Sequence, residues 1–217
     1  MNLELDHAFI LVEPNAEVAD LLLSLDIEES FGKDHKGQGT SNRRFEFSNG
    51  MLEFLWVRDA EEAVNGPGKD LRFPERAGDK TYSPFGVLLH RKSNSQLAMP
   101  FAGWQYQPDY FKPPMAFHVG VNSSDLDAPL CMYVPFVEPI KRTLEKGTLE
   151  KRTFKSISNV TIHTTANKLS DVLAVANKAD RLTITCANEH LMEITFDQHQ
   201  LGLSKDLRPV IPLIIHW

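Results

Sequence analysis

The chain has 217 residues, of which 42% are hydrophobic, and a formal net charge of −6. This is enough to bury a core as one large domain or as two fused modules, and the acidic balance argues against a nucleic-acid partner. The sequence has neither an apolar run of membrane-spanning length nor a signal-peptide pattern, which predicts a soluble, cytoplasmic protein without a membrane partner. Cys131 and Cys186 lack metal-binding or redox spacing and are expected to be reduced, packed thiols.

The first quarter of the chain predicts a strand, a helix and a hairpin. Residues 4–12 alternate as a strand, and Pro14-Asn15 gives a break and a helix cap. An apolar stripe to about Asp26 indicates a short helix. Residues 43–48 and 51–57 read as two strands joined by a two-residue turn at Asn49-Gly50.

The middle of the chain contains long loops. Residues 58–83 carry charges, Gly-Pro-Gly and Pro74, and read as a surface excursion before a strand at 85–91. Residues 96–140 interleave aromatic residues with prolines. They are expected to form an arm that packs over the sheet or across a dimer partner; the alternative is a lid or wall for an apolar ligand. Within them, residues 115–121 alternate as a strand. Residues 141–155 read as a solvated linker.

The last third of the chain partly repeats the first. ISNVTIHT (157–164), a short helix, LTITCANE (182–189) and HLMEITF (190–196) follow the order of LDHAFILV (5–12), its helix, RRFEFSNG (43–50) and MLEFLWV (51–57). When the helices are aligned, Glu53 falls on Glu193 and His7 falls on Ser158. The similarity extends to PFGVLLHR (84–91) and VIPLIIHW (210–217), which place His90 and His216 near their ends.

His7 and Glu53 are the strongest candidates for a functional site. Strand alternation puts His7 on one face with Phe9 and Leu11, and Glu53 on one face of the returning strand between apolar neighbours. A carboxylate in so apolar a strand needs a metal, a cation or a hydrogen-bond donor beside it. Either a functional site or a plain ion pair between Glu53 and Arg44, with His7 as a core histidine, would satisfy that need.

A polar, glycine-containing segment leads into the strand that pairs with the Glu53 strand. Its amide, hydroxyl and guanidinium groups suit an oxygenated or carboxylated ligand, and its glycine would allow close backbone approach. Turn formation alone is the other explanation. The candidate substrate-binding residues are Gln38, Gly39, Thr40, Asn42 and Arg44.

These features resemble the vicinal oxygen chelate superfamily, specifically its glyoxalase-like branch. The resemblance rests on LDHAFILV with its histidine, the following helix, GQGTSNRRFEFSNGMLEFLWV (37–57) and the partial second copy. It implies an α+β fold in which two βαβββ modules pair into an incomplete, cupped barrel. The modules would be residues 1–95 and 156–217, with an irregular aromatic and proline-rich insertion and linker at 96–155.

The resemblance also implies a divalent metal such as Zn²⁺, Mn²⁺ or Fe²⁺. Its ligands would be His7, Glu53 and Glu193, with the two glutamates in catalytic roles. Ser158 departs from the pattern because it is a poor ligand where a fourth would be expected. His163 lies on the opposite face from Ser158, so a complete set would need His118, on the added strand, or another of the eight histidines.

Two functions follow as hypotheses. The first is a metal-dependent lyase, isomerase or ring-cleaving dioxygenase acting on a small oxygenated organic molecule. The second is a metal-free protein that binds or sequesters a small molecule on the same fold. A degenerate module kept for assembly is a third possibility, and a homodimer is compatible with all three.

Overall fold

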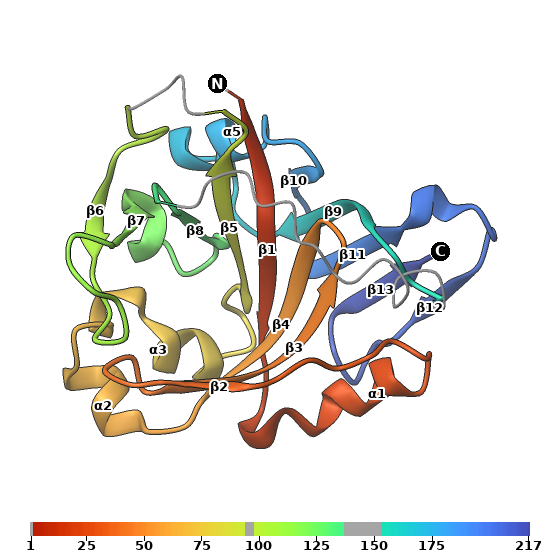
Figure 1. Cartoon of the computed structure of the whole chain (residues 1–217), viewed down its shortest axis with the longest axis horizontal. Helices are drawn as coiled ribbons and strands as arrows, with labels where there is room; N and C mark the ends of the chain where they lie inside the picture. Colours follow the sequence, from red (N-terminus) through yellow and green to blue (C-terminus); the bar gives the residue numbers. More distant parts are fainter. Residues whose placement is uncertain (1, 94–97, 137–152) are drawn as a thin grey trace.

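Two β-sheets and a few short helices make up the molecule (Figure 1). The computed structural model describes residues 2–93, 98–136 and 153–217. The larger sheet is curled into a half barrel, and the smaller sheet lies beside it. The predicted α+β class and the cupped sheet are therefore confirmed.

The curled sheet has eight strands in the order β2-β3-β4-β1-β5-β8-β7-β6. In this sheet β1 lies between β4, to which it is parallel, and β5, to which it is antiparallel. Its strands are β1 (Leu3–Leu11), β2 (Lys33–His35), β3 (Thr40–Phe47), β4 (Gly50–Val57), β5 (Phe85–Arg91), β6 (Gly103–Tyr106), β7 (Phe117–Gly120) and β8 (Leu130–Tyr133).

The second sheet has five strands in the order β10-β9-β11-β13-β12. Here β9 is parallel to β10 and antiparallel to β11, and β11 is parallel to β13. Its strands are β9 (Ile157–Thr164), β10 (Leu182–Cys186), β11 (Leu191–Phe196), β12 (Ser204–Asp206) and β13 (Leu213–His216).

The helices are short, and none in the described part of the chain is long and apolar enough to cross a membrane. They are η1 (Pro14–Ala19), α1 (Asp20–Leu23), α2 (Ala60–Asn65), η2 (Lys69–Leu71), α3 (Phe73–Gly78), η3 (Val121–Ser124), α5 (Asp171–Ala176) and η4 (Asp197–His199).

The main hydrophobic core lies between the two sheets. Alternate residues of β1 and β4, such as Ile10 and Phe54, meet Val160, Ile194 and their neighbours from the second sheet there. The other face of the curled sheet carries a separate apolar cluster. We call this concave face the inner face, and its apolar cluster comprises Phe9, Leu11, Leu55, Leu71, Phe73, Leu88, Tyr106, Phe117, Val119, Leu130, Met132 and Val134.

A β-bulge interrupts β1 at Asp6. Leu5 pairs with Leu89 and His7 with Leu88, so Asp6 is the extra residue between them. Such a bulge changes the phase of side-chain alternation. As a result, Asp6 is buried directly beside His7 rather than facing away from it.

Several predicted elements are confirmed with shifted boundaries. The hairpin between β3 and β4 is present, but Phe47 pairs with Gly50, so its two-residue turn is Ser48-Asn49. The first helix begins as a 3-10 turn at Pro14, and Asn15 has a φ of 68° inside it instead of capping it. The helix predicted in the last third is α5.

The loop-rich middle is more ordered than predicted. Residues 58–83 were expected as a surface excursion, but they contain α2, η2 and α3, and their Leu71 and Phe73 are buried against the inner face. Residues 96–136 contribute β6, β7 and β8 to the curled sheet, of which only β7 was predicted. Most of the linker predicted at 141–155 lies outside the described residues, which stop at 136 and resume at 153.

The two copies of the sequence repeat do not share one strand order. In the first, β1 lies between β4 and β5; in the second, the corresponding β9 lies between β10 and β11. The order of elements along the chain is alike, but the pairing differs. The module pattern is therefore not confirmed.

Candidate functional site

His7 on β1 and Glu53 on β4 point to the same region of the inner face. His7 Nε2 lies 3.9 Å from Glu53 Oε2, which is beyond hydrogen-bond range, and the side chains are 13% and 10% exposed. Phe9 and Leu55, their neighbours at alternate positions, belong to the inner apolar cluster. The predicted facing of both residues is confirmed.

Asp6 fixes the orientation of the His7 ring. The bulge places Asp6 Oδ1 against His7 Nδ1 in a short hydrogen bond. A carboxylate at Nδ1 holds the proton there, which leaves the Nε2 lone pair directed toward Glu53. A lone pair and a carboxylate facing each other at this distance suit a shared hydrogen-bond donor or a cation.

His90 on β5 completes a buried acidic group next to this pair. Its Nε2 lies 2.8 Å from Glu4 Oε1 and its Nδ1 lies 3.3 Å from Asp6 Oδ2. Burial lowers the pKa of His90, but polar contact with Asp6 and Glu4 and their negative charge outweigh burial, so the pKa is raised above its ordinary value. The histidine thus partly neutralises the buried Asp6 and the partly exposed Glu4.

The raised pKa of His90 predicts a pH-dependent contribution to stability. Because the folded state holds this proton more tightly than the unfolded state, the contribution is complete below the unfolded pKa and disappears as pH rises through the folded value. Replacing His90 by Gln should therefore lower the free energy of unfolding more at pH 5.5 than at pH 9. Urea unfolding at both pH values measures the loss of stability in His90→Gln. An equal loss at the two pH values would contradict the prediction.

Asn42 and Arg44 on β3 both lie beside Glu53, and the contact with Arg44 is the ion pair considered as one explanation of the buried carboxylate. Asn42 Nδ2 donates to Glu53 Oε1 at 2.9 Å, and Arg44 Nε lies 3.4 Å from the same oxygen. Arg44 is directly opposite Glu53 in the strand register. Glu53 Oε1 therefore accepts a hydrogen bond from Asn42 and is ion-paired with Arg44, while Oε2 faces His7.

Gln38 and Thr40 lie in a neighbouring buried group that closes the half barrel. Gln38 Nε2 donates to Thr40 Oγ1 at 2.8 Å, and Tyr106 of β6 donates to Gln38 Oε1 at 3.1 Å. Gln38 follows β2, at one edge of the sheet, whereas β6 is the other edge. The hydrogen bond between Gln38 and Tyr106 therefore joins the two edges of the curled sheet.

His35 connects this closing group to the His7 region. Its Nδ1 lies 3.0 Å from Thr40 Oγ1. Burial lowers the pKa of His35 to about 4, with the negative charge of Glu53 opposing that shift and the positive charge of Arg44 adding to it. His35 is therefore neutral at pH 7 and can serve as a hydrogen-bond partner without charge.

Gly39 has a different role from the one predicted. Its φ of 70° favours glycine, and a Cβ there would lie 2.4 Å from Asp59 O and 2.5 Å from Ala63 N. Its carbonyl accepts from the backbone N–H groups of Arg58 and Asp59. The glycine is needed for close approach to the start of α2, with no ligand required to explain it.

Aromatic side chains form one wall of the inner face. Phe111 lies 4.9 Å from Phe117 and 5.1 Å from Phe136 between ring centroids. Tyr110 is 5.5 Å from His35, and Lys33 Nζ lies 4.2 Å from the Tyr110 ring centroid. Part of the predicted aromatic segment thus packs over this chain's own curled sheet, beside the polar group.

Glu193 does not join His7 and Glu53. It lies on β11 of the second sheet, between Met192 and Ile194, which both face the core. Alternation directs Glu193 away from that core, whereas Glu53 faces the inner side of the curled sheet. Both sheets and the core between them separate the two glutamates, so the three implied ligands do not form one centre.

The other residues considered as ligands also lie elsewhere. His118 is buried on the face of β7 opposite Val119 and bonds Phe101 O at 2.8 Å. Ser158 Oγ accepts from the backbone N–H of Gln198. Within the described ranges, no three His, Cys, Asp or Glu side chains are grouped to hold a metal ion. The implied ligand set therefore does not fit a single metal.

Three residues of this site were not among the predicted ones, namely Asp6, His35 and His90. Asp6 was hidden by the bulge, because regular alternation places it on the opposite face from His7. His35 and Tyr110 come together only when the sheet curls. His90 had a signal, since it ends the strand that resembles the last strand of the chain.

Comparison with known proteins gives a fold and no function. No family model and no curated protein matches the chain. A hypothetical protein from Staphylococcus aureus has a similar structure, with a TM-score of 0.55 and 16% identity over 100% of this chain and 99% of that one. A hypothetical protein from Bacillus halodurans C-125 gives a TM-score of 0.40 and 16% identity over 62% and 94%. The first match indicates that the whole fold is shared.

Proposed function

We propose that the inner face of the curled sheet binds a small oxygenated organic molecule without a resident metal. The observation that carries this proposal is the His7 and Glu53 pair, whose facing atoms are 3.9 Å apart and have no direct bond between them. A ligand hydroxyl in this gap would donate its proton to one of the two facing atoms and lie within reach of the other. Asn42 and Arg44 hold Glu53 in place, and the aromatic wall supplies apolar contact.

A metal-dependent lyase, isomerase or ring-cleaving dioxygenase is the second proposal. It is supported by the Asp6–His7 contact, because a carboxylate bonded to the far nitrogen is the usual support of a metal-binding histidine. His7 and Glu53 would be its protein ligands. We also propose that the chain is related to the glyoxalase-like proteins. The order of β1, the first helix, β3, β4 and β5 along the chain and the curled sheet support this relationship.

One set of measurements separates the two proposals. Metal content is measured by mass spectrometry on protein purified without a histidine tag, and stripped protein is titrated calorimetrically with Zn²⁺, Mn²⁺ and Fe²⁺. Stripped protein is also tested by thermal shift against 2-oxo acids, 2-hydroxy acids and catechols. Ligand binding without metal supports the first proposal, and one tightly held ion per chain supports the second.

His7→Ala and Glu53→Gln should each weaken binding of the molecule or ion found, roughly 10- to 100-fold, as expected for loss of a charged hydrogen bond. Calorimetry measures the change. Glu61→Gln, the same replacement at an exposed position of α2, is the matched control and should bind as the parent protein does. Folded His7 and Glu53 variants with unchanged affinity would remove both residues from the site.

A further inference from the structure

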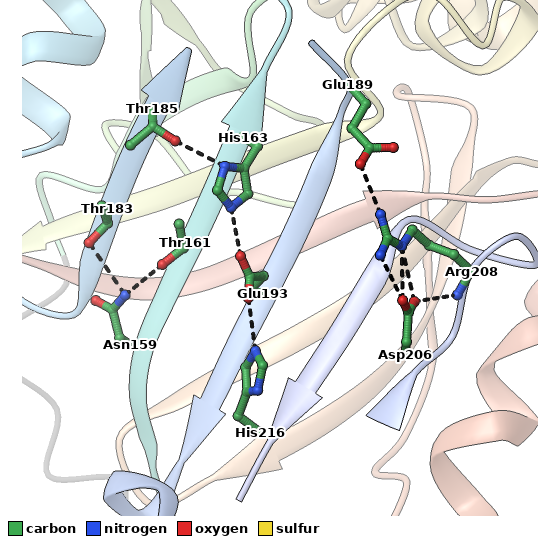
Figure 2. A network of polar contacts seen from close by, with 10 residues as sticks. All are labelled: Asn159, Thr161, His163, Thr183, Thr185, Glu189, Glu193, Asp206, Arg208 and His216. Carbon is green, nitrogen blue, oxygen red and sulfur yellow. Dashed lines mark hydrogen bonds and ion pairs between the residues drawn. The ribbon is translucent and has the colours of Figure 1, made fainter. Parts of the chain in front are cut away.

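A continuous hydrogen-bonded chain crosses the outer face of the second sheet. It takes one residue from each of the five strands, in the order of the strands in the sheet. Figure 2 shows Glu193 at its centre, between His163 and His216. The members are Thr185 on β10, His163 on β9, Glu193 on β11, His216 on β13 and Ser204 on β12.

Every link of this chain has hydrogen-bond length. The two glutamate oxygens lie 2.7 Å from His163 Nε2 and 2.9 Å from His216 Nε2. On the far side of each ring, His163 Nδ1 lies 3.0 Å from Thr185 Oγ1 and His216 Nδ1 lies 2.7 Å from Ser204 Oγ. Each histidine thus stands between the shared carboxylate and a hydroxyl group.

The charge of Glu193 decides where the protons are. Partial burial raises the pKa of Glu193, but hydrogen bonds from His216 and His163 outweigh it and hold the pKa below its ordinary value. The ionised carboxylate can only accept, so each neutral ring carries its proton on Nε2. Each Nδ1 then holds a lone pair that accepts from the neighbouring hydroxyl.

The two hydroxyl groups are not equally accessible. Ser204 is an exposed primary alcohol on β12, at the edge of the sheet, whereas Thr185 is a half-buried secondary alcohol. A triad is recognised by such geometry: a nucleophile bonded to a base, and the base oriented by a third group. Ser204, His216 and Glu193 meet that description.

The backbone of Ser204 offers a donor beside its hydroxyl. Leu203 and Trp217 exchange both of their backbone hydrogen bonds. In an antiparallel pair such positions alternate with unbonded ones, so the next pair, Ser204 and His216, is unbonded. The Ser204 N–H therefore points away from β13 at the edge of the sheet, where it can donate to an oxyanion.

We propose that Ser204 is a nucleophile that accepts an acyl group from a small activated ester, with His216 as its general base. The Ser204 O–H proton moves to His216 Nδ1 while Oγ bonds to the ester carbonyl carbon, whose π electrons move onto its oxygen. Collapse of that adduct breaks the bond to the leaving alkoxide, which takes the proton from His216. Water, deprotonated in the same way, then releases the acid and restores Ser204.

Acetylation of the full-length protein by p-nitrophenyl acetate tests the proposal. Intact-mass measurement and peptide mapping should find one acetyl group on Ser204. Ser204→Ala should abolish this modification, and His216→Gln should slow it at least 100-fold, as loss of a general base does. Thr185→Val, which removes the other hydroxyl of the chain, should change the rate less than about twofold.

Glu193 is a positioning residue, and its role has a spectroscopic signature. Long-range ¹H–¹⁵N spectra should show the Nε2-protonated tautomer of His216 in the parent protein and its loss in Glu193→Gln. Ser204 is exposed, so its replacement by Ala should leave the fold intact, which circular dichroism verifies. Absence of an acetyl group on Ser204, or an unchanged acetylation rate in His216→Gln, would overturn the proposal. The five hydrogen-bonded residues would then only stabilise the contact between the strands.

Discussion

Arg76→Met is expected to lower the free energy of unfolding by about 3 to 5 kcal/mol, the range typical of breaking a buried charged network. Arg76 on α3 is 2% exposed, and its guanidinium donates to the backbone carbonyls of Ser83, Ser123, Asp125, Leu126 and Ala128. Burial lowers the pKa of Arg76 to about 10, so it remains charged at neutral pH. Methionine fills similar space but leaves these carbonyls without their donor.

Arg72→Met is the matched control on the neighbouring turn. Arg72 pairs with Glu75 at the surface, where its side chain is 38% exposed, and such pairs contribute at most about 1 kcal/mol. Urea unfolding of both variants gives the comparison. If Arg76→Met lost no more stability than Arg72→Met, the carbonyls would have to find other partners, and Arg76 would not hold the loop after β7.

Asn49→Ala is expected to cost about 2 to 6 kcal/mol of unfolding free energy, because two backbone groups of a buried residue lose their partner at about 1 to 3 kcal/mol each. The Asn49 side chain donates to Ile157 O and accepts from Ile157 N, both at 2.8 Å. It thus pairs with the first residue of β9 as a neighbouring strand would. The hairpin turn of the curled sheet is fastened to the second sheet by this side chain.

The control for Asn49 is Asn159→Ala, on the outer face of β9. Asn159 donates to Thr161 and Thr183 but is partly exposed, so water can replace it. Its loss should cost less than about 1 kcal/mol. Thermal unfolding ranks the two variants, and equal destabilisation would show that Asn49 does not join the sheets.

Local pattern was sufficient for the elements whose partners are close in sequence. The β3–β4 hairpin, the first helix and the facing of His7 and Glu53 all follow from alternation or helical period over short windows. The equally short β7 was predicted because it lies in the alternating window 115–121. Strands β6 and β8 were not predicted, because their pairing depends on curling of the sheet. Such tertiary pairing leaves little trace in local sequence.

In the candidate site, too, only contacts between residues on neighbouring strands of one hairpin could be inferred from local sequence. Asn42 and Arg44 lie beside Glu53 because they are on the neighbouring strand, and their role in binding a ligand stays a prediction. Glu193 was placed in the predicted site because its sequence segment resembles that of Glu53, and similar segments were assumed to occupy equivalent positions. Similar segments can pair differently, and β9 does not pair as β1 does. Its partners His163 and His216 come together across three strands, a relation that no local spacing encodes.

The extra residue in β1 couples the hydrophobic core to the inner face. Leu3 and Leu5 precede Asp6, Ala8 and Ile10 follow it, and all four reach the core because Asp6 shifts the phase between them. Regular alternation through Asp6, without the bulge, would turn Leu3 and Leu5 toward the inner face, whereas deletion of Asp6 would leave both leucines in the core. A descendant of this chain could therefore lose the contact between Asp6 and His7 by a single deletion while the core packing of β1 stays the same.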